Sequence, residues 1–270
     1  MRNYCLPDSL NGVKRGDRLR LGNENKKLRL LFCIPLALHY LCSKNTIVMD
    51  LLEAIEQRHS VRRYTDQPIE AEKMRELQRL VNECNHETGM HIQMVLNDPK
   101  AFDSKLAHYG RFSGVRNYFV IAGRKGKDLE EKSGYYGEQL VLKAQTMGLN
   151  TCWVALTYRK NPEVFSLAPG EKLVCVIAFG YGKNQGASHK IKPRAEVMDC
   201  EGLPPEWFIQ GVDAALLAPT ALNQQKFRFI LRGRKVKARK GFGFWTKLDL
   251  GIVKYHFELG AGKENFEWEK

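Results

Sequence analysis

The chain has 270 residues, of which 43% are hydrophobic and 27% charged, and its formal net charge is +13. This composition is typical of a globular protein that can bury a substantial core, and it excludes a chain too polar to fold. Residues 1–48 hold nine Lys/Arg and three Asp/Glu, a net +6 that leaves +7 for the rest. This remaining excess has no interleaved aromatic stripe, so the sequence predicts no nucleic-acid partner.

The first 48 residues differ from the rest of the chain. The apolar run "LRLLFCIPLALHYLC" (Leu28–Cys42) is too short to cross a membrane comfortably, no small-residue cleavage site follows it, and Pro35 would break a helix there. Met49 directly precedes the amphipathic stretch "MDLLEAIEQR". We therefore expect Met49 to be the true start and residues 1–48 to be an extension outside the fold. A signal or anchor segment and an extra helix are the alternatives.

From Met49 onward, helical and strand patterns alternate. A helix over residues 50–58 is followed by an arginine-rich loop. Further helices are expected over Glu70–Cys84, Tyr135–Asn150, Pro205–Ala218 and Lys247–Gly262. Strands are expected over His91–Leu96, Asn117–Gly123, Thr151–Leu156, Lys172–Gly180 and Phe227–Leu231. The pattern predicts an α+β fold with helices packed on a mixed sheet.

The densest basic cluster and the cysteines both have ordinary interpretations. The cluster "RGRKVKARK" (Arg232–Lys240) is interpreted as a solvated turn or sheet edge rather than a groove-binding segment. The seven cysteines show neither CxxC nor zinc-finger spacing, which favours reduced thiols in the cytoplasm and no metal site. Cys152 and Cys175 lie in apolar runs and are expected in the core.

Two parts of the chain resemble each other in their order of elements. Residues 79–96 align with residues 215–231 as helix end, loop and strand. Residues 139–153 align with residues 251–268 as helix, glycine and aromatic residue. The repeat predicts two half-domains, 49–195 and 196–270, that form a pseudo-dimer within one chain, with a crevice between them.

Four motifs carry a resemblance to a known family. "RHSVRRYTDQPI" (Arg58–Ile69) resembles the opening signature of the flavin-dependent nitroreductases, and "APTALNQQKFRF" (Ala218–Phe229) is similar to their Ala-Pro-Ser-x-x-Asn-x-Gln segment. "MGLNTCWVA" (Met147–Ala155) resembles their Gly-Leu-Gly-x-x-Trp segment, and "KIKPR" (Lys190–Arg194) resembles their late basic pair. The resemblance covers Met49 to the end and points to a nitroreductase-like fold, in the branch with two half-domains fused in tandem.

The motifs do not follow the usual family order. The Asn-Gln loop stands in the second half, whereas the corresponding first-half loop, "NECNHETGM", has lost the pattern. The second half has "VMDCEGLPPEW" where an Arg-Ser loop would stand, and this segment contains no arginine. In family homodimers the two loops reach one flavin from different chains. The resemblance therefore implies one composite site per chain and a monomer with an internal pseudo-two-fold axis.

The resemblance also implies which residues bind flavin mononucleotide (FMN). Arg58 and Arg62 suit a phosphate dianion because guanidinium groups form charge-assisted, bidentate hydrogen bonds. The expected cofactor-binding residues are Arg58, His59, Ser60, Arg62, Cys152, Trp153, Lys192, Arg194, Pro219, Thr220, Asn223 and Gln225. Asn223 and Gln225 would pair with ribityl hydroxyls or ring heteroatoms. Alternative interpretations remain: Arg63 as surface charge, Asn223 as a turn residue, Trp153 as core and His59 as solvated.

The expected activity is that of an FMN-dependent oxidoreductase in the cytoplasm. The resemblance implies that electrons pass from NAD(P)H through flavin to a nitroaromatic, quinone or similar small acceptor, with no catalytic protein residue. No G-x-G-x-x-G loop is present, so a Rossmann nicotinamide site is not implied. A membrane partner is not expected. A flavin-binding protein without turnover and a scaffold that binds no flavin are the alternatives.

Overall fold

The computed structural model describes residues 49–103 and 110–269, so the expectations for residues 1–48 lie outside the described residues. The elements are, in chain order, α2 (Leu51–Gln57), α3 (Ala71–Thr88), β1 (Gln93–Val95), η1 (Lys100–Phe102), β2 (Asn117–Arg124), α5 (Leu129–Thr146), β3 (Asn150–Val154), β4 (Glu171–Gly180), α6 (Arg194–Val197), β5 (Met198–Cys200), α7 (Glu206–Leu216), η2 (Ala221–Asn223), β6 (Phe227–Arg232), β7 (Lys235–Lys240), α8 (Thr246–Ala261), η3 (Lys263–Asn265) and β8 (Glu267–Trp268). The described elements form the α+β fold that the sequence predicts. None of the described helices is both long and apolar enough to cross a membrane.

The first sheet has the strand order β1-β2-β4-β3, and each neighbouring pair is antiparallel. Its central strands β2 and β4 are covered on both faces, by one apolar cluster with the helices and by a second with the loops of the same half. A strand buried on both faces has a continuous apolar sequence rather than an alternating one. This explains the runs "YFVIA" in β2 and "VCVIAFG" in β4.

The second sheet has the order β5-β6-β7-β8, with β6 and β7 antiparallel and the two outer pairs parallel. Strand β6 alternates strictly, because Phe227, Phe229 and Leu231 are buried while Arg228 and Arg232 are exposed. The basic cluster Arg232–Lys240 was expected to be a turn or an edge. The turn is present, but β7 lies between β6 and β8, and its buried Val236 anchors it to the core.

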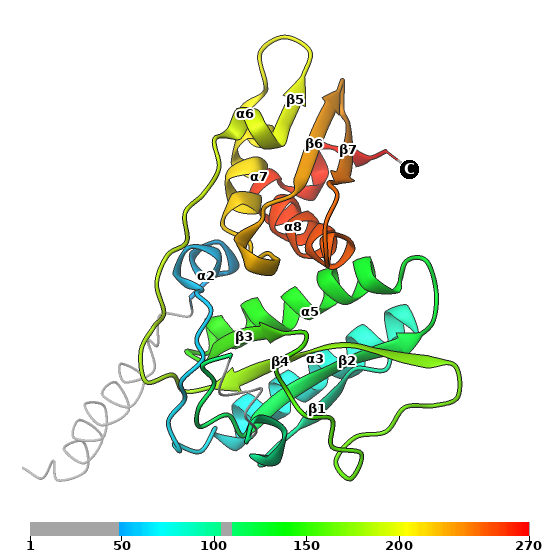
Figure 1. The fold of residues 1–270 in the computed structure, drawn as a ribbon. Coiled ribbons are helices and arrows are strands. Elements are labelled where there is room, and N and C mark those ends of the chain that lie inside the picture. The colour runs from blue at the N-terminus through cyan, green and yellow to red at the C-terminus, as the bar shows by residue number, and fades with distance from the viewer. Residues whose placement is uncertain (1–48, 104–109, 270) are drawn as a thin grey trace, which may run out of the picture. The chain divides into compact units, whose positions relative to one another are not determined.

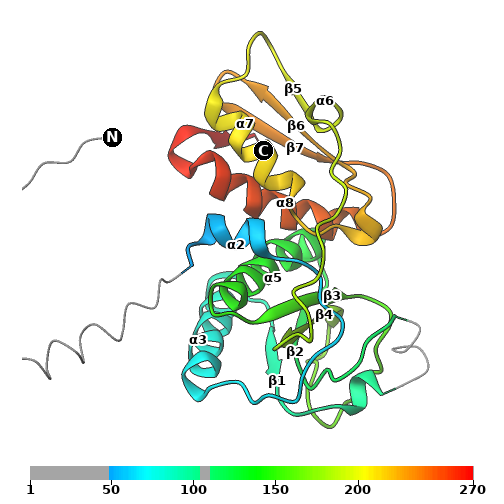
Figure 2. The same ribbon diagram turned by 90° about the vertical axis from the view of Figure 1, so that its left-hand side faces the viewer.

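Helices α5, α7 and α8 lie between the two sheets and share one apolar core with both (Figure 1 and Figure 2). Helix α5 begins at Leu129, six residues before the predicted start at Tyr135. Its first turns, "LEEKSG", contain too few apolar residues to show helical periodicity. They are nevertheless buried in part, since Ser133 and Gly134 face α8.

The contact between α5 and α8 depends on one glycine from each helix. Gly134 and Gly251 are each the sixth residue of their helix. A Cβ atom on Gly134 would lie 2.0 Å from the carbonyl oxygen of Leu248, and one on Gly251 would lie 1.9 Å from that of Glu131. The two helices therefore approach backbone to backbone, and the contacts are reciprocal: Leu248 and Glu131 are each the third residue of their helix.

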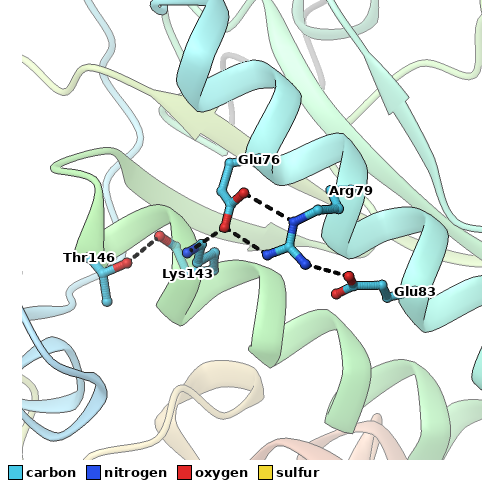
Figure 3. A network of polar contacts seen from close by, with 5 residues as sticks. All are labelled: Glu76, Arg79, Glu83, Lys143 and Thr146. Carbon is cyan, nitrogen blue, oxygen red and sulfur yellow. Dashed lines mark hydrogen bonds and ion pairs between the residues drawn. The ribbon is translucent and has the colours of Figure 1, made fainter.

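Polar contacts hold α3 against α5 at the protein surface (Figure 3). Lys143 Nζ lies 2.9 Å from Glu76 Oε1, and Arg79 donates to Glu76 and also pairs with Glu83. The hydrogen bond from Arg79, together with that from Lys143, lowers the pKa of Glu76 to about 2. The carboxylate therefore stays ionised at neutral pH, although an exposed pair of this kind contributes little to stability.

The same order of elements occurs twice in the described chain. The series α3-β1-β2-α5-β3 has the order of α7-β6-β7-α8-β8, and both internal hairpins, β1/β2 and β6/β7, are antiparallel. This order is the one that the predicted internal repeat requires. The division into half-domains at residues 195 and 196 stays a prediction.

Candidate cofactor site

The arginine-rich segment Arg58–Tyr64, called the strap below, is extended and lies along the edge of the first sheet. Helix α2 ends at Gln57, and the strap pairs with β3 through Ser60 and Thr151. Buried Val61 and Tyr64 anchor the strap, so the intervening Arg62 is left exposed. Val61 and Tyr64 therefore face the core, while Arg62 and Arg63 face the other side of the segment.

Arg58 is a buried cation with unused hydrogen-bonding capacity. Its side chain is 3% exposed, and its Nε atom has no hydrogen-bond partner among the described residues. The nearest counter-charge is Glu138 Oε1, 4.0 Å from Nε. Burial lowers the pKa of Arg58, and the charge of Glu138 opposes this effect. An unsatisfied buried donor is costly, so the guanidinium is prepared to accept an anionic ligand.

Glu138 connects Arg58 to other parts of the core. Its Oε2 atom accepts a 2.8 Å hydrogen bond from the Trp153 indole, and its Oε1 atom lies 2.9 Å from His256 Nε2. His256 Nδ1 lies 3.0 Å from the Ala214 carbonyl, which can only accept, so Nδ1 carries a proton. The Glu138–His256 contact joins α5 to α8 in the middle of the core.

A cavity of about 140 Å³ lies beside this network. It is formed by the strap, β3, α8 and the loop before β6, which come from both of the predicted half-domains. Its lining residues are Ser60, Arg62, Trp153, Val154, Ala155, Cys175, Pro219, Thr220, Ala221, Leu222, Trp245, Leu248, Asp249 and Ile252. The structure thus brings two motifs that are about 160 positions apart in the sequence to one cavity.

Cys152 lies behind the cavity, against the strap. Its thiol is buried and donates a hydrogen bond to the Trp153 carbonyl oxygen at 3.6 Å. Burial raises the pKa of Cys152, while the charges of Arg62 and Arg58 act in the opposite direction. His59 is half-buried, and burial together with the charge of Arg58 lowers its pKa. Cys152 therefore lies close to the strap, and its role in binding a cofactor stays a prediction.

The loop before β6 has an unusual backbone. Leu222, Asn223 and Gln225 have φ angles of 53°, 52° and 44°, a left-handed conformation that non-glycine residues rarely adopt. Asp249 in the first turn of α8 holds this loop. Its Oδ1 accepts a 2.9 Å hydrogen bond from the Ala221 amide, and its Oδ2 accepts a 2.7 Å bond from Gln224 Nε2. Backbone strain that the surroundings maintain is characteristic of binding sites.

Asn223 and Gln225 bind the chain segment that joins the first sheet to α6. Both side-chain amides donate to the Lys190 carbonyl oxygen at 2.8 Å, and Gln225 Oε1 accepts a 2.9 Å bond from the Lys192 amide. Gln225 is only 2% exposed. In this structure the two residues position the Lys190–Lys192 segment, a role that the sequence interpretation did not include.

The late basic pair has acidic partners. Arg194 forms two hydrogen bonds to the Asp213 carboxylate, at 2.5 and 2.6 Å, and the Lys192 ammonium lies 3.8 Å from Glu196. Both cations are therefore neutralised by carboxylates of the second half. Arg62 of the strap lines the cavity, and no salt bridge pairs it with an acidic residue among the described residues.

Of the twelve cofactor-binding residues expected from the sequence, five line this cavity: Ser60, Arg62, Trp153, Pro219 and Thr220. The other seven do not line it, and a role in cofactor binding stays a prediction for all twelve. Sequence reasoning missed Glu138, His256 and Asp249, which are buried polar residues within helices and belong to no motif. Their periodic positions resemble those of core residues, so no local sequence signal distinguishes them. Only their hydrogen bonds to residues far away in the chain reveal them.

Asp249 is expected to make folding stability depend on pH. Burial raises its pKa to about 6 from 3.8. Because the folded-state pKa is the higher one, its contribution to stability is fully present below about pH 4. It is lost as the pH rises through about 6, by roughly 3 kcal/mol. We expect Asp249→Asn to remove this slope from the unfolding free energy measured in urea between about pH 4 and pH 7. Asp66→Asn, at an exposed carboxylate, should keep it, and parallel curves for Asp249→Asn and wild type would contradict the assignment.

Comparisons to known proteins identify the family and the fold. A family model described as "Putative TM nitroreductase" matches residues 50–261, and the chain therefore belongs to this nitroreductase family. A crystal structure of a "putative nitroreductase" from Thermotoga maritima has a TM-score of 0.58 at 23% identity, over 80% of this chain and 86% of that chain. This likeness shows the nitroreductase fold.

Two further solved structures are similar over about half of the chain. An FMN-dependent nitroreductase from Clostridium difficile has a TM-score of 0.41 at 19% identity, over 51% of this chain and 90% of that chain. A "putative nitroreductase in complex with fmn" from Desulfovibrio desulfuricans has a TM-score of 0.41 at 20% identity, over 54% of this chain and 93% of that chain. No curated protein matches the sequence.

Proposed function

We propose that this protein is an FMN-dependent oxidoreductase that passes electrons from NAD(P)H to a nitroaromatic, quinone or similar small acceptor. The observation that carries the proposal is a cavity lined by Ser60 and Arg62, next to the core network in which the buried Arg58 Nε atom lacks a hydrogen-bond partner among the described residues. Arg58 itself is not among the lining residues, but Glu138 connects it to Trp153, which is. Membership of the nitroreductase family supports it. So does the FMN complex of the Desulfovibrio desulfuricans structure.

The donor groups of the strap fit the phosphate end of FMN. Arg58 and Arg62 would hold the phosphate with Ser60, because guanidinium and hydroxyl donors complement a dianion. Cys152 and His59 would complete this end of the site. Lys192 and Arg194 would contribute through their net positive field, although their carboxylate partners weaken it.

The other cavity wall suits the isoalloxazine ring. Trp153, Pro219 and Thr220 present apolar and hydroxyl groups there, and Asn223 and Gln225 hold the neighbouring backbone in place. When bound, FMN would supply the redox chemistry, accepting two electrons from NAD(P)H and passing them to the acceptor. The protein would bind the cofactor, orient it and exclude water from its buried end.

We further propose one FMN per chain, bound between half-domains 49–195 and 196–270 within a monomer. The strap occurs only in the first half and the strained loop only in the second, which supports a single composite site. The reciprocal contact of Gly134 and Gly251 supports it as well, since it resembles a dimer interface enclosed in one chain. We propose that the protein works in the cytoplasm as a monomer, without a partner chain.

The experiment is a titration of the apo-protein with FMN, followed by addition of NADH or NADPH under nitrogen. We expect saturation at about one FMN per chain, a monomer by light scattering, and loss of flavin absorbance near 450 nm after the donor is added. Bound FMN that never bleaches would indicate a binding protein without turnover. A chain that takes up no FMN, or two equivalent FMN per chain, would contradict the proposal.

A further inference from the structure

Three large apolar side chains are exposed beside the cavity mouth. Leu222 is 100% exposed, Phe242 is 96% exposed and Phe244 is 86% exposed. Leu222 itself lines the cavity, and so does Trp245, the residue after Phe244. Single exposed apolar residues are common in soluble proteins, but a group of them at one cavity marks a binding surface.

The two loops that carry these side chains are joined by hydrogen bonds. Gln224 Nε2 donates to the Phe244 carbonyl oxygen at 2.8 Å and to Asp249 Oδ2 at 2.7 Å. Asp249 also receives the Ala221 amide at 2.9 Å. One glutamine and one buried carboxylate therefore fix Leu222 and Phe244 relative to each other and to the cavity.

The backbone at these positions is strained. Leu222 has a φ of 53° and Trp245 a φ of 62°, both in the left-handed region. Bulky residues rarely adopt this conformation, and no burial of the Leu222 side chain offsets its cost. The strained backbone leaves the Leu222 side chain fully exposed in this structure. A ligand that covers this side chain would give the strain a physical reason.

Positive charge lies next to the apolar group. Lys240 and Lys247 flank the segment that carries Phe242 and Phe244. The Lys226 ammonium lies 3.1 Å from the position of a Cβ on Gly243, the residue between the two phenylalanines. A ligand that suits this surface has a flat hydrocarbon face and electron-rich oxygens at its edge, and a cationic ligand is disfavoured.

We propose that Leu222, Phe242 and Phe244 form an acceptor-binding rim, which covers the face of a planar, hydrophobic acceptor that carries carbonyl or nitro oxygens. The rim sets the preference for such acceptors over small hydrophilic ones. This inference rests on the proposed function, because the acceptor would receive its electrons at the neighbouring cavity.

The test uses the full-length chain loaded with FMN and two acceptors, 2-methyl-1,4-naphthoquinone and ferricyanide. Leu222→Asn removes the apolar side chain without adding strain, since asparagine tolerates positive φ. For Leu222→Asn and for Phe244→Ser we expect kcat/KM for the naphthoquinone to fall about tenfold, or about 1.4 kcal/mol, through a higher KM. Ferricyanide needs no apolar contact, and Phe244 does not line the cavity, so the values for ferricyanide in Phe244→Ser should change by less than about twofold.

Leu203→Asn is the matched control, because Leu203 is 96% exposed but lies between β5 and α7, outside the cavity lining. It should behave as wild type with both acceptors. Equal losses with the two acceptors in Phe244→Ser, or an unchanged preference in both variants, would overturn the rim assignment.

A binding measurement separates the rim from the proposed function. Quenching of tryptophan fluorescence gives the Kd of the naphthoquinone without turnover, and Trp245 lies in the cavity wall. We expect Leu222→Asn to raise this Kd about tenfold. If NAD(P)H bleaches no flavin but the Kd shift is present, the proposed function fails and the rim stands. If bleaching occurs and the Kd is unchanged, the rim is wrong.

Discussion

Replacing Arg58 by alanine is expected to weaken FMN binding strongly and to destabilise the fold at the same time. Loss of a charge-assisted phosphate contact costs about 1.5–3 kcal/mol, or about tenfold to a hundredfold in affinity. Arg58 is also the buried cation nearest to Glu138, at 4.0 Å. Removal of one partner of a buried pair costs up to about 3–5 kcal/mol, and this long contact should lie below that range.

Two neighbouring arginines serve as matched variants for Arg58→Ala. Arg62 is exposed and lines the cavity, so Arg62→Ala should weaken FMN binding and leave stability unchanged. Arg63 is exposed, and it neither lines the cavity nor contacts Glu138 as Arg58 does, so Arg63→Ala should do much less. FMN titration of the apo-proteins and unfolding in urea measure the two effects separately. Equal effects on FMN affinity at all three positions would show that the strap does not bind the phosphate.

Replacing Gly251 by alanine is expected to be among the most destabilising single changes in the protein. The new Cβ atom would lie 1.9 Å from the Glu131 carbonyl oxygen and 2.7 Å from the Tyr135 amide nitrogen. Both are backbone atoms of α5, so no side-chain rotation relieves the clash and the two helices must separate. Overpacking costs at least about 1–3 kcal/mol, whereas alanine gains only about 1 kcal/mol over glycine in helix propensity.

Three further substitutions provide comparisons for the loss of stability in Gly251→Ala. Gly134→Ala should behave like Gly251→Ala, because its Cβ atom would lie 2.0 Å from the Leu248 carbonyl oxygen. Gly137→Ala should cost less, because its close neighbour at 2.4 Å is the Trp153 ring, a side chain that can shift. Lys247→Ala on the exposed surface of α8 is the control for helix propensity alone. A Gly251→Ala protein as stable as wild type in urea unfolding would contradict the close crossing of α5 and α8.

Elements with one apolar face were predictable from the sequence. Helices α7 and α8 lie within about two residues of their predicted bounds, because a stripe of buried residues recurs along each. Strand β7 was not predicted, since "KVKARK" presents only Val236 as a large apolar residue and depends on pairing with β6. The start of α5 was missed because glycine and serine, rather than large apolar residues, make its contact with α8.

The motifs around Arg58 and Asn223 could be found because each is contiguous, and the nitroreductase family that they suggested was confirmed. Their spatial relation was inferred from the lost and retained loops of the two halves. The structure brings Ser60 and Thr220 to one cavity, as that inference requires. The partners of Asn223, Gln225 and Arg194 were not predictable, because those contacts join segments that approach only after folding.

The family, the α+β class and the positions of most helices and strands could be predicted from the sequence, because these depend on local patterns and contiguous motifs. The contacts of Glu138 with Arg58, Trp153 and His256, and of Asp249 with the strained loop, are visible only in the folded chain. Burial explains this difference. A carboxylate in a helix gives the same local pattern whether it meets water or a partner more than 100 positions away, and only packing brings the partner within hydrogen-bonding distance.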